Sequence, residues 1–183
     1  MALLDDVINL LVSTTFWIAI GTLGALAALF LTWWQIRGTR IIAATDFLLK
    51  HGDSFSSDRL LKKRHKIMQV VKQDLGDFQK MDECREVFEF FEELGLLLRM
   101  KVIGKELVWS NYCYWIQHYW TAFQGYIEWI GKKDSDPTLY CEFEYLYKQI
   151  HAYDERKRNQ TVEIGPQQVL EFIDDETRLA TIK

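Results

Sequence analysis

Proline and cysteine are scarce in this sequence, and each scarcity excludes something. The chain of 183 residues has only two prolines, Pro137 and Pro166, and both fall at predicted helix boundaries, so long helices run without interruption. Its three cysteines, Cys84, Cys113 and Cys141, are odd in number and far apart, without a CxxC pair. This pattern excludes a disulfide framework and a cysteine zinc site, and it favours free thiols in a reducing cytoplasm.

The sequence also lacks an excess of positive charge and the usual catalytic motifs. Lys and Arg number 22 against 26 Asp and Glu, which gives a net charge of −4. General nucleic-acid binding requires a basic surface, so it is not expected here. There is no P-loop, glycine-rich dinucleotide turn, zinc-ligand spacing or nucleophile elbow, and no strand pattern, internal repeat or low-complexity segment. Neither a metal nor a cofactor is predicted.

What the sequence does contain is one long apolar run. No charged residue occurs from Thr14 to Ile36, and an α-helix needs about 20 apolar residues to cross a bilayer core of about 30 Å. Trp17 near one end and Trp33 and Trp34 near the other match two interfacial aromatic belts. The run is longer than a signal-peptide core and acidic residues precede it, so cleavage is not expected. A buried core helix of a soluble protein is the alternative.

Charges and small residues give this run an orientation and a contact face. Arg37 and Arg40 follow the run and no Lys or Arg precedes it, which predicts an outer N-terminus and a cytoplasmic C-terminal part. Residues 3–13 are expected to form an interfacial helix or an extension of the span. The run also contains a row of small residues whose spacing lets two membrane helices approach closely: Gly21, Gly24, Ala25 and Ala28. This row predicts self-association, and the alternative is that it reflects the ordinary abundance of small residues in membrane helices.

Helical periodicity continues through the rest of the chain. A break is expected at His51–Ser54, Ser57 is predicted to cap the next helix, and residues 161–164 are expected to be a short extended piece. The aromatic side chains between residues 105 and 132 indicate the buried centre of a bundle, with an aromatic ligand cage or base-stacking platform as the alternative. The predicted helices cover residues 39–50, 57–73, 81–101, 105–132, 139–158 and 166–180.

Arg59 and His65 form the one candidate catalytic pair. Their spacing resembles the loose R-x(4–6)-H signature of the helical HEPN ribonucleases, in which an Arg and a His from two protomers act on the phosphodiester. Leu60 stands where that family usually has a polar residue. The alternative is a solvated basic patch beside an anionic membrane, formed by Lys62, Lys63, Arg64 and Lys66.

The remaining candidate groups are carboxylates and one histidine. Glu92, Glu93 and Glu106 have no His three or four residues later, so the Glu-x-x-His pattern of di-metal bundles is absent. We therefore expect these glutamates to be ordinary charges on helix surfaces. His118 lies among aromatic residues and is expected to be a core histidine rather than a ligand or a base.

Two segments carry a resemblance to known proteins. FEFFEELGLLLRMKVIGKELVWSNYCYWIQHYW at residues 88–120 and EFEYLYKQI at residues 142–150 resemble a group of bacterial proteins known only by a domain of unknown function. Members of this group commonly have one N-terminal membrane helix and a small helical domain, and several are encoded near phage-defence genes. The matching positions are mostly aromatic residues and glycines. The resemblance implies a shared core and a bacterial inner-membrane location, and it implies no activity.

The sequence therefore predicts an all-α protein. Residues 1–38 are expected to hold the N-terminal segment and the transmembrane helix, and residues 39–183 a cytoplasmic helical bundle. The predicted function is a membrane-anchored interaction module with the bilayer and further copies of the chain as partners, acting as an anti-phage sensor or effector. The alternatives are a tethered HEPN-like ribonuclease that uses Arg59 and His65, and a receptor for a nucleotide signal. A protein partner or a nucleotide ligand is compatible with the sequence, which identifies neither.

Overall fold

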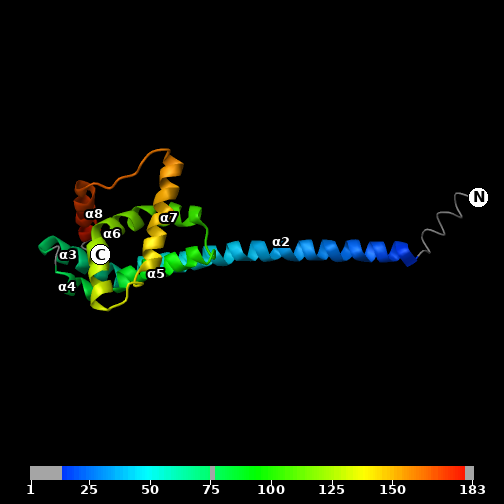
Figure 1. Cartoon of the computed structure of the whole chain (residues 1–183), viewed down its shortest axis with the longest axis horizontal. Coiled ribbons are helices and arrows are strands. Elements are labelled where there is room, and N and C mark those ends of the chain that lie inside the picture. Colours follow the sequence, from blue (N-terminus) through cyan, green and yellow to red (C-terminus); the bar gives the residue numbers. More distant parts are fainter. Residues whose placement is uncertain (1–13, 75–76, 180–183) are drawn as a thin grey trace, which may run out of the picture. The chain divides into compact units, whose positions relative to one another are not determined.

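The computed structural model of the chain describes residues 14–74 and 77–179. Every regular element among these residues is a helix and none is a strand, which confirms the predicted all-α class (Figure 1). The chain consists of two compact units, residues 1–43 and residues 44–183. The helices are α2 (Thr14–Phe55), α3 (Asp58–Gln73), α4 (Phe78–Asp82), α5 (Glu86–Arg99), α6 (Lys105–Lys133), α7 (Cys141–Arg158) and α8 (Pro166–Leu179).

The first part of α2 is the apolar run. Its segment Phe16–Ile36 has 21 residues and a mean hydropathy of 1.8, so it is long and apolar enough to cross a membrane. The side chains of residues 17–36 are all exposed. Two of its polar side chains, Thr22 and Thr32, donate hydrogen bonds of 2.6 and 2.8 Å to carbonyls one turn earlier. These hydroxyls are therefore satisfied within the helix, as an apolar surrounding requires.

The last turns of α2 belong to the core of the second unit. The helix continues to Phe55, so the break predicted at His51–Ser54 is wrong. His51 is buried, and its ring stacks on Phe90 with the centroids 4.1 Å apart. A Cβ on Gly52 would lie 3.1 Å from the Tyr112 hydroxyl, so this glycine serves the close approach of α2 to α6 and does not end the helix.

The centre of the second unit lies where α5, α6 and α7 pack against one another (Figure 1). Phe88 of α5 stacks on Tyr126 of α6 with centroids 4.9 Å apart, and Phe91 of α5 stacks on Phe143 of α7 at 4.8 Å. This stacked aromatic core accounts for the aromatic content of residues 105–132. The buried side chains of α6 follow helical spacing and include Tyr112, Ile116, Tyr119, Phe123, Tyr126 and Ile130.

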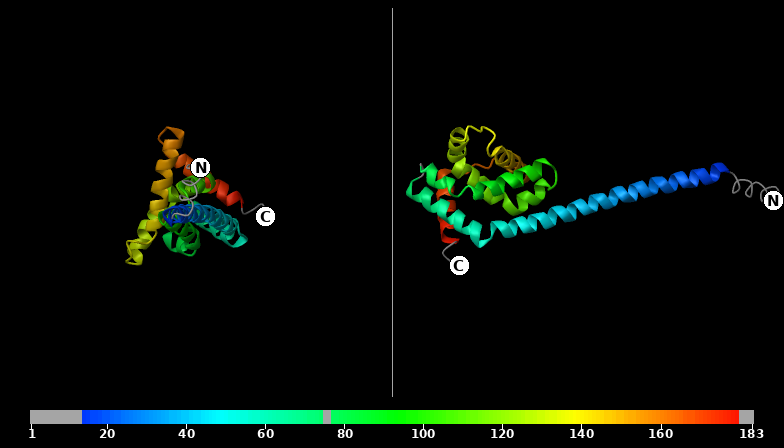
Figure 2. Two further views of the ribbon diagram at one scale, coloured as in Figure 1. Left: turned by 90° about the vertical axis from the view of Figure 1, so that its right-hand side faces the viewer. Right: turned by 90° about the horizontal axis from the view of Figure 1, so that it is seen from below.

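The smaller helices pack beside this centre, α3 against α5 and α4 against α6, and α8 packs mainly on α3 (Figure 2). The predicted cap of α3 is confirmed, because the Ser57 hydroxyl accepts a hydrogen bond of 3.3 Å from the backbone N–H of Leu60. The single helix predicted over 81–101 is wrong, since α4 and α5 are separated by a turn at 83–85. Cys84 is buried in this turn, and Arg85 reaches back to Asp82 at 2.7 Å. Residues 161–165, which include the segment predicted to be extended, are neither helix nor strand.

Candidate functional site

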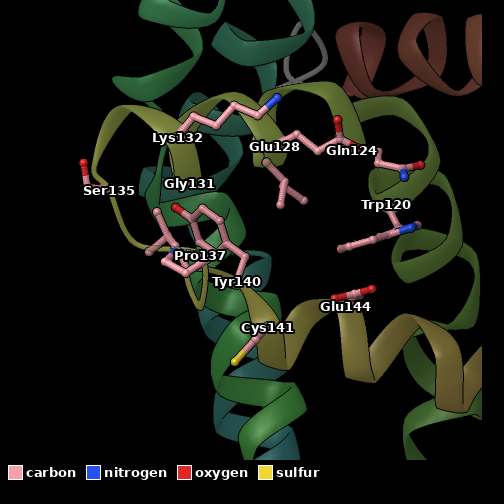
Figure 3. A pocket seen from close by; sticks show the side chains of 12 residues that line it. Trp120, Gln124, Glu128, Gly131, Lys132, Ser135, Pro137, Tyr140, Cys141 and Glu144 are labelled. Carbon is pink, nitrogen blue, oxygen red and sulfur yellow. The ribbon is translucent and has the colours of Figure 1, made fainter.

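The second unit contains a groove lined by both polar and apolar side chains. It has a volume of about 610 Å³ and lies between one face of α6, the loop that follows α6, and the first turn of α7 (Figure 3). The α6 residues that line it recur every three to four positions, at 120, 124, 127–128 and 131–132, so they share one face of that helix. The lining side chains include Trp120, Gln124, Ile127, Glu128, Gly131, Lys132, Ser135, Pro137, Leu139, Tyr140, Cys141 and Glu144.

Trp120 provides a fixed aromatic surface in this groove. Its ring stacks on Tyr147 with the centroids 5.4 Å apart, and it meets Phe143 edge-on at 5.3 Å. Both neighbours come from α7, so the indole orientation depends on the packing of α6 against α7. A rigid aromatic ring beside polar side chains is typical of sites that bind small organic molecules.

Charged side chains surround the aromatic surface. Glu144 forms an ion pair of 2.5 Å with Lys148 on the next turn of α7. Glu128 and Lys132 have no ion-pair partner among the residues that the structure describes. The Glu128 carboxylate is therefore available to a hydrogen-bond donor or a cation of a ligand, and the Lys132 ammonium is available to an acceptor or an anion.

Tyr140, at the start of α7, has an unusual conformation. Its φ of 62° lies in the left-handed region, which is a genuine outlier for a bulky residue. Its hydroxyl is buried and has no hydrogen-bond partner among the described residues, and burial raises its pKa above the ordinary value for tyrosine. A strained residue with an unpaired polar atom is a common mark of a functional site.

Cys141 contributes a free thiol to the groove. Its side chain is largely exposed. Its partial burial and the negative charges of Glu92 and Glu142 raise the pKa of the thiol above the ordinary value for cysteine. Among the described residues that line the groove there is no histidine to act as its base. Across the described chain, no three or more His, Cys, Asp or Glu side chains are arranged as a metal site. The groove thus offers a thiol, a carboxylate, an ammonium group and an aromatic ring to a ligand.

The candidate catalytic pair is not brought together within one chain. Arg59 is exposed and forms an ion pair of 3.0 Å with Glu86, where it lines a polar cavity of about 260 Å³. His65 lies on another side of α3, with Nδ1 3.0 Å from the carbonyl oxygen of Thr177. His51, in the cavity beside Arg59, is the residue that sequence reasoning missed there, and burial lowers its pKa.

The basic patch is smaller than predicted, because Arg64 is buried. Only 4 % of Arg64 and 4 % of Glu176 are exposed, and the two side chains form a bidentate pair at 2.9 and 2.7 Å. Arg64 also donates to the carbonyl of Phe55. The charge of Arg64 therefore serves the packing of α8 on α3. The remaining members of the patch are Lys62, which is exposed, Lys63, which lies 3.9 Å from Glu86, and Lys66, which is paired with Glu83.

Glu92 also differs from its prediction as surface charge. Its half-buried carboxylate accepts hydrogen bonds from the backbone N–H groups of Glu142 and Phe143, at 3.2 and 2.7 Å, and so it caps the start of α7. Glu93 and Glu106 are exposed as expected. His118 is half-buried, and burial lowers its pKa.

The predicted membrane residues lie on an exposed helix. Trp17, Trp33 and Trp34 are exposed at the two ends of the apolar stretch. A Cβ added at Gly21 or Gly24 would meet no described atom within 4 Å. Ala25 and Ala28 are exposed as well. The side chains of Arg37 and Arg40, together with the predicted helix at 3–13, lie outside the described part of the chain.

The comparison with protein-family models matches residues 18–150 to DUF4760, a domain of unknown function. Because the match covers well over half of the chain, the protein belongs to this family. The matched range contains most of the apolar stretch, α3 to α6 and part of α7, and it ends before α8. No curated protein and no solved structure matches the chain.

Proposed function

We propose that this DUF4760 protein is a membrane-anchored interaction module, in which the apolar stretch of α2 spans the bilayer and the second unit binds its partners. The observation that carries the proposal is the exposure of residues 17–36 on a helix that is apolar enough to cross a membrane. In water, such a surface would be a large unfavourable patch. The second unit has a core of its own, so it does not need this stretch for burial.

Self-association of the span is the more specific part of the proposal. Gly21 and Gly24 leave one side of the helix open, which supports the close approach of a second copy. The resemblance to bacterial proteins encoded near phage-defence genes favours a sensor or effector role at the inner membrane, with the second unit in the cytoplasm. In that role, assembly in the membrane would be the event that the second unit reports or triggers.

The first test separates anchoring from assembly. Full-length protein should remain with liposomes after alkaline carbonate extraction, and release into the soluble fraction would overturn the anchor. In mild detergent its native mass should be that of an oligomer, and Gly24→Leu should reduce that mass. Ala19→Leu is the matched control, because residue 19 lies on the opposite side of the helix. Equal masses for both variants and the unchanged protein would refute assembly through the small residues.

The groove favours a second candidate function, a receptor for a small ligand such as a nucleotide signal. The supporting observation is the rigid Trp120 ring beside Glu128 and Lys132, neither of which has an ion-pair partner in the described chain. A nucleotide that binds the native state should raise the melting temperature, and the rise should grow with the logarithm of its concentration above the dissociation constant. Trp120→Ala should abolish that rise, whereas Trp129→Ala, outside the groove, should keep it. No shift with any ribonucleotide or cyclic dinucleotide would rule this candidate out.

A further inference from the structure

The loop between α5 and α6 lies at the end of the second unit where α2 enters it. Phe55 of α2 contacts Phe91 of α5 at 5.8 Å, whereas His51, one turn earlier, lies 4.0 Å from Glu93. The two helices are thus antiparallel. The C-terminal end of α5, at residue 99, therefore lies at the same end of the second unit as residue 44 of α2. On α6, the Tyr112 hydroxyl lies 3.4 Å from the carbonyl oxygen of Leu48. The start of α6 is therefore at the same end.

This end of the second unit is close in the chain to the apolar stretch. The stretch ends at Ile36 and the second unit begins at Ala44. The residues between them span about 10 Å if helical and about 25 Å if extended. A bilayer that holds the stretch would therefore lie within that distance of the entry end of the second unit.

The loop has the surface chemistry that an anionic bilayer recognises. Leu96, Met100 and Val102 are 46 %, 65 % and 43 % exposed, so three apolar side chains within seven residues of the chain face solvent. Between Glu93 and Glu106 the chain carries three cations and no acid. Arg99 pairs with Glu142 of α7 at 2.6 Å and Lys105 donates to Gln149 at 2.5 Å, so Lys101 is the cation without such a partner among the described residues. Exposed apolar side chains surrounded by Lys and Arg are the signature of a surface that inserts among lipid headgroups.

The loop also holds these side chains in place. Lys101 has a φ of 58°, and the N–H groups of Lys101 and Val102 donate to the carbonyls of Leu98 and Leu97 at 3.1 and 3.0 Å. This is the Schellman arrangement at a helix end, with Lys at the position where Gly is usual. Ile103, in contrast, is buried. Lys101 has no ion-pair partner among the described residues, so its charge is available.

We propose that the loop at residues 96–105 is a second membrane contact, which docks the second unit on an anionic lipid surface beside the anchor. The proposal rests on the proposed membrane anchor. Docking through the loop would orient the whole second unit with respect to the bilayer. It would also leave the groove, whose α6 lining from Trp120 to Lys132 lies about 22–40 Å from the start of that helix, free for partners.

Depth-dependent fluorescence quenching in vesicles tests this contact with the full chain. A bimane label is placed at residue 102 by Val102→Cys in a Cys141→Ser background. The other two thiols react slowly, because Cys84 is buried and burial raises the pKa of Cys113 to about 12. Vesicles contain phosphatidylcholine and phosphatidylglycerol with a doxyl-labelled lipid. Matched labels at Leu23→Cys, in the span, and at Ser135→Cys, at the far end of α6, serve as references.

The expected result is strong quenching at residues 23 and 102 and at least twofold weaker quenching at residue 135. Quenching at 102 should fall in vesicles of phosphatidylcholine alone. It should also fall in Met100→Glu, but not in Leu170→Glu, which changes an equally exposed residue of α8. Quenching at 23 without quenching at 102 would overturn the loop contact and leave the anchor intact. No quenching at 23 would overturn the anchor itself. Shielding of residue 102 from both doxyl lipid and aqueous iodide would show a protein covering the loop, which would also overturn the proposal.

Discussion

Gly95 is the residue at which a single methyl group should be most damaging. It is buried where α5 crosses α7, and a Cβ built on it would lie 2.0 Å from the carbonyl oxygen of Glu142 and 2.6 Å from its carbonyl carbon. These are backbone atoms of α7, so no side chain can rotate out of the way. Gly95→Ala therefore forces the two helices apart at the most extensive helix–helix contact in the second unit.

The size of the effect follows from two opposing terms. Alanine gains about 0.8–1 kcal/mol over glycine in a helix interior. Overpacking of a close contact costs about 1–3 kcal/mol, and more when backbone must move. We expect a net loss of about 2 kcal/mol and a melting temperature lower by about 5–10 °C. Gly125→Ala in α6 is the matched control, because its Cβ would meet Phe78 at an ordinary 3.6 Å and should be neutral or stabilising.

Thermal unfolding of the full-length protein in one detergent, followed by circular dichroism, measures both variants under the same conditions. The cap that Glu92 provides to α7 lies one turn from Gly95, so Gly95→Ala should also weaken it and increase amide exchange at Glu142 and Phe143. If Gly95→Ala matched Gly125→Ala in stability, α5 and α7 would not cross as closely as the structure has them, and the reasoning would fail.

Three further predictions concern buried charge and exposed thiol. Glu176→Gln should lower the free energy of unfolding, measured by chemical denaturation, by about 3–5 kcal/mol, because it leaves Arg64 buried without its partner. The double variant Arg64→Met, Glu176→Gln should lose less than the sum of the two single variants, and additive losses would contradict this. Burial lowers the pKa of both His51 and His118, so these histidines take up protons in the unfolded chain at a higher pH than in the folded one. The free energy of unfolding should therefore fall as pH drops below about 6.5, by up to about 1.4 kcal/mol per pH unit for each histidine. Replacing both histidines by Gln should flatten this dependence, and a flat profile for the unchanged protein would refute it. Iodoacetamide should modify Cys141 alone in the native protein, at a rate that rises with pH to above 9, and labelling of another thiol at a similar rate would be the contrary outcome.

Local sequence signals predict much of this fold correctly. Ser57 caps α3 because its side chain needs only the backbone N–H three residues later. Gly104 and Lys105 mark the start of α6, and Pro166 marks the start of α8, as predicted. The apolar stretch is also a local property, since it depends on one uninterrupted run of side chains. Each of these signals involves residues that are neighbours in the chain.

The errors arise where the deciding contact is distant in the sequence. His51–Ser54 contains glycine, aspartate and serine, which are typical of a helix end, yet stacking of His51 on Phe90 keeps the helix intact. Arg64 is surrounded by lysines in the sequence and has the pattern of a solvated residue. Its burial depends on Glu176, which lies 112 positions later. No periodicity within α3 carries that information.

The groove could not be predicted for the same reason. Its aromatic surface was visible in the sequence only as part of a helix that is aromatic over much of its circumference. What distinguishes Trp120 from Trp109 is the neighbour: Trp120 faces the groove, whereas the indole N–H of Trp109 donates to the carboxylate of Asp154 at 2.7 Å. The groove also requires the left-handed backbone conformation of Tyr140. The sequence does not predict this conformation, because Tyr is not one of the residue types that favour turns.

The buried polar atoms of α6 explain why most of its aromatic residues are core rather than a ligand cage. A buried indole N–H or phenol hydroxyl needs a hydrogen-bond partner, and two of those on α6, from Trp115 and Tyr119, are satisfied by the same carboxylate, Glu176. That carboxylate in turn neutralises Arg64 of α3. One acidic side chain of α8 thus completes the hydrogen bonding of α3 and α6 together. The family match ends before α8, so residues equivalent to Arg64 and Trp115 in a DUF4760 chain without this helix would need another partner. Removal of α8 should therefore destabilise the second unit far more than the loss of its apolar contacts alone.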